Sequence, residues 1–574
     1  MGRLKRNNAP VPRHSEKLLK FTGGAAEIIL RILVWIAAAL ILAALPFYMQ
    51  DGYTHIGSDK SYFFRSGCAK LGSIILPVLG VCVLCRLVEA LLHRKERLFQ
   101  KWLKGLCVTD YLAFLYGISV IVSYLCSDYR ETALWGTTGW YMGMLPQLAF
   151  VTLYFLIRFF QVKAEWMLIL NMLASGLAFA LGYLNRFNIW PIPIKYSERF
   201  TFISTIGNIN WYCGYLMAVF FVGVGILWLQ KKEKNGIDWG TWLLCGYVLI
   251  GFATLITQGS ESGVFALAAV LFVMFVISAK DGDRHRIDRF WLIVLLLAIA
   301  GGLTFVLRLI VPGRITFTFL AGDLLTYSPL PFAMAAVAAT GILMARRGEG
   351  APFELLRRGM RILSKICCVA VLPLFVSFVG MIVLNTLRPG SLGGLSGMGV
   401  FTFDNAWGSS RGATWTLGLR CFLEQDFLHK LTGVGPDCMA DFLYKGGSES
   451  LLAAAQQAFE NMRLTNAHCE PLTILVNEGI LGMLCYVGML LSHIYYLTRK
   501  RADNACAAAC GLCVLAYLVN SLWSFQQTMG AAPLFVIMGL GGNLLHRSEA
   551  SHPQGEQFSP RHSQSRKTDS FMQA

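Results

Sequence analysis

Apolar runs of about 20 residues recur along the whole chain and alternate with short polar links. A helix of about that length crosses the roughly 30 Å hydrocarbon layer of a bilayer. The pattern therefore predicts an all-α polytopic membrane protein with about fourteen transmembrane helices. The predicted spans are residues 25–49, 67–92, 105–126, 140–160, 164–184, 210–229, 239–257, 261–279, 290–311, 327–345, 366–386, 471–497, 504–522 and 528–545.

One long segment interrupts this pattern. Residues 387–470 are too polar to lie in a membrane, and we expect them to form one large extracytoplasmic loop that contains helices. The predicted spans therefore fall into two groups, 25–386 before the loop and 471–545 after it. Residues 1–24 form a basic cytoplasmic tail, and residues 546–574 are polar without apolar periodicity, which predicts a disordered cytoplasmic tail.

Composition and charge support this topology. The chain is 55% hydrophobic and only 14% charged, whereas soluble proteins carry about 25% charged residues. Basic clusters fall in alternate links, such as 94–97, 231–234 and 499–501. By the positive-inside rule, this predicts a multi-pass protein of the cytoplasmic (inner) membrane with both termini cytoplasmic. The net charge of +17 then reflects topology and contact with the anionic lipid bilayer, and we expect no nucleic-acid partner.

Two amphipathic helices are predicted within the large loop. The first follows Ser409 and Ser410, which favour a helix N-cap, and ends before the Gly- and Pro-containing segment 432–436. Its predicted apolar stripe is Trp415, Leu419, Phe422 and Leu423. The second begins near Ser448 and uses Leu451, Leu452, Ala455, Phe459 and Met462. Both helices are expected to lie flat on the outer membrane surface, with their apolar stripes facing the lipid.

Three side chains on the predicted outer side could carry chemistry. His468 lies where the large loop meets the twelfth span, Arg411 lies at the start of the first loop helix, and Arg199 precedes the sixth span. A guanidinium offers a planar fork of donors to phosphate oxygens, and an imidazole can take a proton from a hydroxyl. The alternatives are a structural histidine and arginines that reach toward water or lipid phosphate. The residues alone therefore predict a membrane protein with an outward-facing site for an anionic substrate.

The order of these features resembles the O-antigen ligase and polymerase family. The most specific matches are Thr432-Gly433-Val434-Gly435-Pro436-Asp437, His468, and Leu475-Val476-Asn477-Glu478-Gly479-Ile480-Leu481-Gly482-Met483-Leu484. Weaker matches are Arg411 with Trp415, Arg199 before Gly207-Asn208-Ile209-Asn210, Thr257-Gln258-Gly259-Ser260-Glu261-Ser262-Gly263, and Leu134-Trp135-Gly136. The chain departs from the family pattern at Cys469 (usually Asn), Ile209 (usually Pro) and Glu261 (usually Arg). The last departure removes a cation, so no third phosphate-binding arginine is expected there.

The resemblance implies a metal-independent glycosyltransferase that needs no cofactor and inverts the anomeric carbon. Its donor would be a glycan linked to polyprenyl (undecaprenyl) diphosphate, and its acceptor a hydroxyl of a glycan, lipid or protein. His468 would be the general base, and Arg411 and Arg199 would hold the diphosphate. Asn208, Asn210, Gly433 and Gly435 would support the site, although the two glycines fit a plain helix stop equally well.

Three other functions remain open at this stage. A repeat-unit polymerase of the same family would use the same donor with a second lipid-linked glycan as the acceptor. A transporter or lipid-linked glycan flippase would place its functional charges at mid-membrane and show internal repeats. Here the distinctive charges crowd the predicted outer face, which favours an enzyme. A scaffold with a degenerate site would tolerate the loss of His468.

Overall fold

The computed structural model describes residues 13–50, 56–92, 105–193, 202–230, 239–311, 320–348, 350–460, 462–499 and 504–551. Nearly all regular structure in these ranges is helical; the strands β1 (Phe202–Ile203) and β2 (Gly207–Asn208) form one short antiparallel ribbon. The helices up to the large loop are α1 (Arg13–Ala39), η1 (Leu40–Ala44), η2 (Leu45–Phe47), α2 (Ile56–Leu92), α4 (Val108–Cys126), α5 (Arg130–Trp135), α6 (Met144–Phe160), α7 (Ala164–Arg186), α8 (Ile209–Val219), α9 (Phe221–Leu229), α10 (Trp239–Leu255), α11 (Glu261–Asp281), α12 (Arg284–Ile310), α13 (Leu320–Thr326), α14 (Leu330–Arg346) and α15 (Ala351–Leu387). The large loop contains η3 (Gly393–Leu395), η4 (Gly399–Phe401), α16 (Trp407–Glu424), α17 (Phe427–Thr432), α18 (Met439–Asp441), η5 (Phe442–Gly446) and α19 (Glu449–Phe459), and it is followed by α20 (Glu470–Arg499), α21 (Ala505–Ser521) and α22 (Thr528–Ser551).

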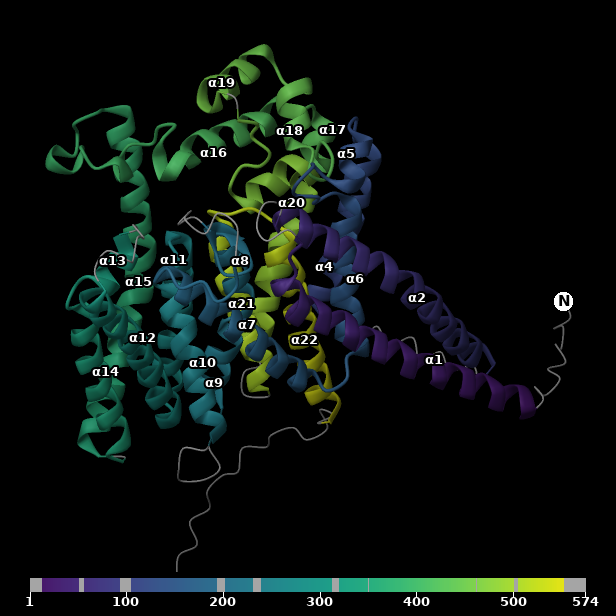
Figure 1. Cartoon of the computed structure of the whole chain (residues 1–574), viewed down its shortest axis with the longest axis horizontal. Helices are drawn as coiled ribbons and strands as arrows, with labels where there is room; N and C mark the ends of the chain where they lie inside the picture. Colours follow the sequence, from purple (N-terminus) through teal and green to yellow (C-terminus); the bar gives the residue numbers. More distant parts are fainter. Residues whose placement is uncertain are drawn as a thin grey trace, which may run out of the picture.

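The helix lengths and apolar composition make this a multi-pass, all-α membrane protein (Figure 1). Among the described residues, ten helical segments are long and apolar enough to cross a membrane, with α8 and α9 joined as one. Four shorter apolar helices, α6, α10, α14 and α21, lie among them. Each of the fourteen predicted segments overlaps one of these helices.

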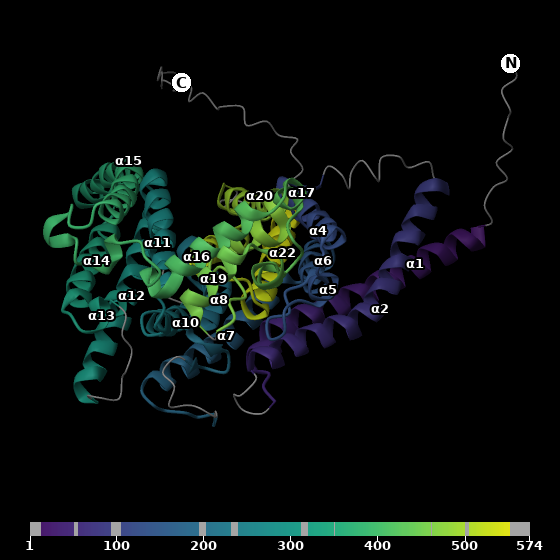
Figure 2. The ribbon, with the colours of Figure 1, turned by 90° about the horizontal axis from the view of Figure 1, so that it is seen from above.

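Burial distinguishes a central group of helices from a peripheral one. The apolar windows of α8–α9 and α22 are 94% and 100% buried, whereas that of α15 is 0% buried. In the centre, α22 packs against α6 and α8, and α21 packs against α9, α11 and α20. Helices α1 and α2 pair with each other and extend away from the bundle in both views (Figures 1 and 2). A helix that is apolar on all sides must be surrounded by either protein or lipid, so the exposed apolar helices are expected to contact the lipid of a bilayer.

Three helices begin more than ten residues earlier than the hydropathy pattern predicted. Helix α1 begins at Arg13 instead of residue 25, within the segment predicted as a tail. Helix α2 begins at Ile56, so its first turns occupy residues 56–66, which the sequence indicated as a link. Its Lys60 is buried and donates hydrogen bonds to the carbonyl oxygens of Leu45 and Pro46, at 2.9 and 2.7 Å. Helix α15 begins at Ala351 instead of residue 366. The predicted spans 67–92 and 366–386 begin just after Arg65 and Lys365, but the helical backbone extends beyond the apolar stretch because its hydrogen bonds do not require apolar side chains.

The large loop folds into a layer on one end of the bundle (Figure 1). Both predicted loop helices are present as α16 and α19, and Ser448 caps α19 by accepting a hydrogen bond from the Leu451 N–H at 3.2 Å. Their predicted orientation is wrong in part. The apolar face of α19 packs into a small core of the loop itself and does not face lipid. Leu419 and Leu423 of α16 are 47% and 57% exposed, so the lipid-facing orientation of α16 stays a prediction.

The buried face of α16 is determined by small side chains that allow close packing. Ala413, Leu417 and Cys421 are buried, and a Cβ at Gly418 would lie 2.9 Å from the Cβ of Ala467. Hydrophobicity alone therefore predicts a face of α16 that contains the large leucines. The face that packs against α20 is a different one, whose smaller side chains allow the two helices to approach closely.

Candidate functional site

His468 occupies the junction between the large loop and α20. Its backbone lies in the left-handed region at φ 48°, and its N–H donates to Asn466 Oδ1 at 3.0 Å. The ring makes an edge-on contact with Phe525, with 5.1 Å between the ring centroids. Neither ring nitrogen has a protein hydrogen-bond partner within the described ranges. The imidazole is thus held in place by the backbone and by Phe525, and both nitrogens remain available to a substrate.

The surroundings of His468 favour its neutral form. Partial burial and the positive charge of Arg411 lower the pKa of His468 from 6.5 to about 4. At neutral pH the imidazole is therefore unprotonated and can accept a proton, although its low pKa makes it a weak base.

Arg411 begins the regular part of α16, directly after a kink. Gly408, Ser409 and Ser410 all have positive φ angles, of 59°, 59° and 67°. The Arg411 guanidinium donates from Nε and Nη2 to the Trp523 carbonyl at 3.0 and 2.9 Å, and from Nη1 to the Gly408 carbonyl at 2.7 Å. These bonds use three of the five N–H donors of a guanidinium, so two remain for an anion. Burial lowers the pKa of Arg411, and Glu261 acts in the opposite direction.

The connection between α21 and α22 brings these two side chains together. Trp523 accepts the hydrogen bonds of Arg411, and Phe525, two residues further on, contacts His468. Trp523 also stacks on Phe265 of α11, at 5.1 Å between ring centroids. No residue of this connection was predicted to belong to the site. The signal was the run Trp523-Ser524-Phe525-Gln526-Gln527, which is polar and aromatic between two apolar helices.

A small cavity with an acidic wall is lined in part by Phe525. Its volume is about 20 Å³, and Asp437, Glu470 and Glu478 contribute to its wall. Asp437 accepts the N–H groups of Thr137 and Met142 at 2.7 and 3.1 Å. Glu470 accepts from Tyr517 at 3.0 Å and also from Tyr486, and Glu478 accepts from Gln147 at 2.9 Å. Burial raises the pKa of Asp437 to about 7. The sequence reasoning assigned no role to these carboxyl groups.

Gly433 and Gly435 hold the loop against a break in α20. Val434 and Gly435 donate their N–H groups to the carbonyls of Val476 and Asn477 at 3.2 and 3.0 Å. A Cβ at Gly433 would lie 2.0 Å from the Asn477 carbonyl oxygen, and α20 is interrupted at Gly479, with φ 71°. Both motif glycines therefore have a packing role in positioning the segment that follows α17.

The asparagines of the second motif lie at the start of α8. The Asn208 side chain caps this helix by accepting the Asn210 N–H at 2.9 Å. Within the described ranges neither residue bonds to His468 or Arg411. The ring of their neighbour Trp211 contacts the ring of Trp140, with 5.5 Å between centroids, and Trp140 contacts Phe525, with 4.8 Å between centroids. The start of α8 is thus connected to Phe525 through the ring of Trp140. Arg199 lies outside the described residues.

One further cation borders the same region. Arg186, in the last turn of α7, is 6% exposed and donates to the Gln258 carbonyl. Gln258 belongs to the segment 257–263, in which the sequence led us to expect no phosphate-binding arginine. The fold thus places a guanidinium from another helix beside that segment. No spacing along the sequence indicates this, because residues 186 and 258 are brought together by packing.

No model of a known protein family matches the chain, and no curated protein matches it. A function for this site is therefore inferred from its chemistry.

Proposed function

We propose that this chain belongs to the O-antigen ligase and polymerase family and transfers a glycan from polyprenyl diphosphate to an acceptor hydroxyl. The observation that carries the proposal is the convergence of Arg411 and His468 on the connection between α21 and α22. A guanidinium with spare donors beside a neutral imidazole with free nitrogens suits an anionic leaving group next to a hydroxyl nucleophile.

In the proposed reaction, the acceptor hydroxyl attacks the anomeric carbon while a nitrogen of His468 takes its proton. The bond between the anomeric carbon and the diphosphate oxygen breaks with inversion, and polyprenyl diphosphate leaves with that electron pair. The two spare donors of Arg411 stabilise the charge that develops on the diphosphate, together with Arg199 as proposed from the sequence. Such preorganised donors typically contribute a few kcal/mol each to lowering the barrier.

Donor binding would also activate the base. Arg411 lowers the pKa of His468 in the free protein. A bound diphosphate neutralises that positive charge, so the pKa of His468 rises and the imidazole becomes a stronger base when the donor is in place. This coupling links deprotonation of the acceptor to occupancy of the donor site.

The proposal includes a topology. Fourteen spans in the cytoplasmic membrane, with both termini cytoplasmic, would place the large loop, Arg411 and His468 on the extracytoplasmic face. The support for it is the alternation of basic links along the chain and the overlap of every predicted span with an apolar helix.

The intramembrane charges argue against the transporter alternative. Asp110 of α4 and Arg158 of α6 form an ion pair at 2.5 Å and are 1% and 2% exposed. Arg158 also donates to the Gly542 and Gly105 carbonyls at 2.6 and 3.2 Å. A charge pair held by this many partners is suited to joining helices, whereas an ion pathway needs charges that change partners.

The test is the surface-glycan profile of cells in which the gene is deleted and then restored as wild type, His468→Ala or His429→Ala. His429 is the matched control, because it lies in the same loop and its ring pairs with Asp426 at 2.7 Å. We expect His468→Ala to insert normally and to lower transfer by about 10²–10⁴-fold, the usual contribution of a general base. Normal glycans in His468→Ala cells, or equal losses in both variants, would contradict the proposal.

The deletion strain also separates the two members of the family. Long polymer that remains on its lipid carrier would identify a ligase, and single repeat units on the carrier would identify a polymerase. Arg411→Lys tests the leaving-group role, because a point charge replaces a fork of donors. Its control is Arg420→Lys on the same helix, where the guanidinium forms a surface ion pair with Glu424 at 3.3 Å and donates to Ser450 Oγ at 2.9 Å.

A further inference from the structure

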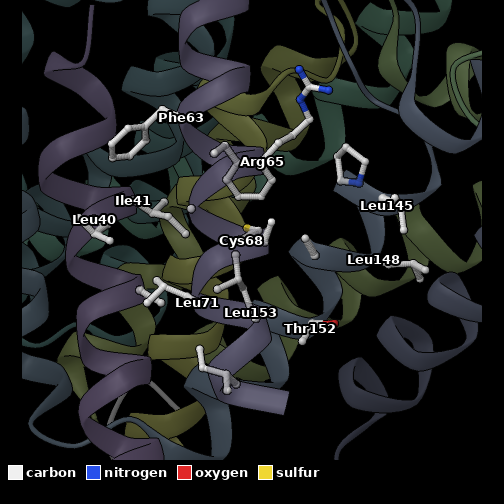
Figure 3. A pocket seen from close by; sticks show the side chains of 18 of the residues that line it. Leu40, Ile41, Phe63, Arg65, Cys68, Leu71, Leu145, Leu148, Thr152 and Leu153 are labelled. Atoms are coloured by element: carbon white, nitrogen blue, oxygen red, sulfur yellow. The ribbon is translucent and has the colours of Figure 1, made fainter. Parts of the chain in front are cut away.

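A large apolar groove lies between the α1–α2 pair and α6 (Figure 3). Its volume is about 390 Å³, within the range of pockets that enclose a small ligand. The wall is formed by apolar side chains and glycine, among them Ile41, Leu71, Gly72 and Leu148. Leu76, Trp135 and Leu145, which also line it, are 60%, 48% and 39% exposed. The groove is therefore open on the side where exposed apolar residues of α2 and α6 would face the lipid.

One charged side chain lines this groove. Arg65 lies at one end of it, and the apolar residues follow toward Thr152 and Leu153 (Figure 3). The guanidinium carbon lies 3.9 Å from the centroid of the Tyr141 ring. Among the described residues Arg65 forms no ion pair and no hydrogen bond, and its Nε is enclosed without a partner. Its positive charge thus lies at one end of the groove, and no anion among the described residues pairs with it.

The charged end of the groove lies beside the large loop. Tyr141 belongs to the segment 136–143, in which Thr137 and Met142 donate their N–H groups to Asp437. From Arg65 the lining of α2 continues through Cys68 and Leu71 toward the middle of the helix. A cation at the end of a groove that becomes apolar with depth matches a lipid, which has an anionic phosphate above a hydrocarbon tail.

We propose that this groove binds an anionic phospholipid, with one acyl chain between α1, α2 and α6 and its phosphate on Arg65. The site is separate from the proposed transfer centre and does not depend on it. Neither His468 nor Arg411 lines the groove. Arg65 therefore does not share an anion with Arg411, and the volume suits one acyl chain better than the much longer chain of a polyprenyl carrier.

The experiment measures the lipids that remain with the full-length protein after purification in mild detergent, by mass spectrometry, per mole of protein. The groove-filling variant is Gly72→Phe, and the control is Gly80→Phe. An added Cβ at either α2 glycine meets no atom within 4 Å, but only Gly72 lines the groove. Arg65→Gln removes the charge and leaves the groove open, so it reports on the phosphate contact even if Gly72→Phe does not fold.

We expect the wild type and Gly80→Phe to retain an anionic phospholipid that Gly72→Phe loses. In Arg65→Gln, retention of anionic over zwitterionic phospholipid should weaken roughly tenfold, as expected for the loss of one charge-assisted hydrogen bond. Equal phospholipid in all four proteins would overturn the proposal. Recovery of an isoprenoid phosphate in place of the phospholipid would also overturn it, and would assign the groove to a carrier lipid. Loss of phospholipid with normal glycan transfer would support this site independently of the proposed activity.

Discussion

The imidazole of His468 and the guanidinium of Arg411 are coupled through their charges, because Arg411 lowers the pKa of His468. Chemical labelling reports this coupling without any knowledge of the substrate. Diethyl pyrocarbonate modifies only the neutral imidazole, so labelling of His468 in the free protein should decline with a midpoint near pH 4 as the pH is lowered. Burial of the ring, the larger cause of the low pKa, remains in Arg411→Gln, but the midpoint should still move upward because a positive neighbour has been removed.

Site-resolved mass spectrometry of the peptide that contains His468 measures this labelling, with His429, whose ring pairs with Asp426, as an internal reference. An unchanged midpoint in Arg411→Gln would show that the two groups do not interact in solution. The same shift on addition of a lipid-linked diphosphate would support donor-induced activation of the base.

Asp437 gives a second prediction at the scale of one residue. Burial raises its pKa from 3.8 to about 7, so the folded state favours the protonated form. Its contribution to stability is present below pH 3.8 and is lost as the pH rises through 7. Asp437→Asn keeps an oxygen for the Thr137 and Met142 N–H groups and removes the titration. Between pH 6 and 8 the thermal midpoint of the wild type should therefore fall more steeply than that of Asp437→Asn, as differential scanning fluorimetry in detergent can measure. Parallel slopes would contradict the assignment.

At the scale of the element, the break in α20 aligns the glycine motif of the large loop. Gly479 has φ 71° and ψ −173°, and a Cβ there would lie 2.3 Å from the Leu431 carbonyl oxygen. Backbone strain of this kind costs on the order of 1–3 kcal/mol. We therefore expect Gly479→Ala to lower the thermal midpoint and to loosen segment 431–435.

Gly488→Ala in the same helix is the matched control. Its added Cβ would meet Leu112 at 3.4 Å, which is an ordinary contact, and alanine favours a helix interior. The melting temperatures should separate the two variants, and limited proteolysis should cut the large loop faster only in Gly479→Ala. Equal stability of the two proteins would show that the break in α20 is not required.

At the scale of the whole molecule, the ion pair of Asp110 and Arg158 joins α4 and α6, and Arg158 extends the connection to α22. Asp110→Asn leaves a buried guanidinium without its counter-ion, which typically costs about 3–5 kcal/mol of stability. Glu354→Gln removes a partner from the exposed pair with Arg357 and should cost less than about 1 kcal/mol. Melting temperatures in detergent test both. If Asp110→Asn melts like the wild type but changes solute flux in proteoliposomes, the transporter alternative gains support over the transferase.

The helices were largely predictable from the sequence because lipid imposes a simple requirement. Each span must be apolar over about 20 residues and satisfy its own backbone hydrogen bonds, so its position can be recognised without any knowledge of its neighbours. The positions of α16 and α19 were predictable in part. Ser448 is the N-cap of α19, but Ser409 and Ser410, the expected N-cap of α16, lie in a kink with positive φ angles, and α16 ends at Glu424 before the separate α17. The buried faces of α16 and α19 were not predictable, because these helices pack on the loop core and α20 through small residues such as Gly418.

By itself, the sequence of this protein determined a helical, multi-pass membrane architecture, one large polar loop, and the location of His468 at its junction with α20. Those properties depend on local hydrophobicity and on short-range capping, which a chain carries wherever it folds. Only the tertiary structure placed Arg411 and His468 on the connection between α21 and α22, set Arg186 beside Gln258, and opened a groove beside Arg65. These are contacts between segments far apart in the sequence. They arise from how helices pack against one another, and local sequence patterns do not predict that packing.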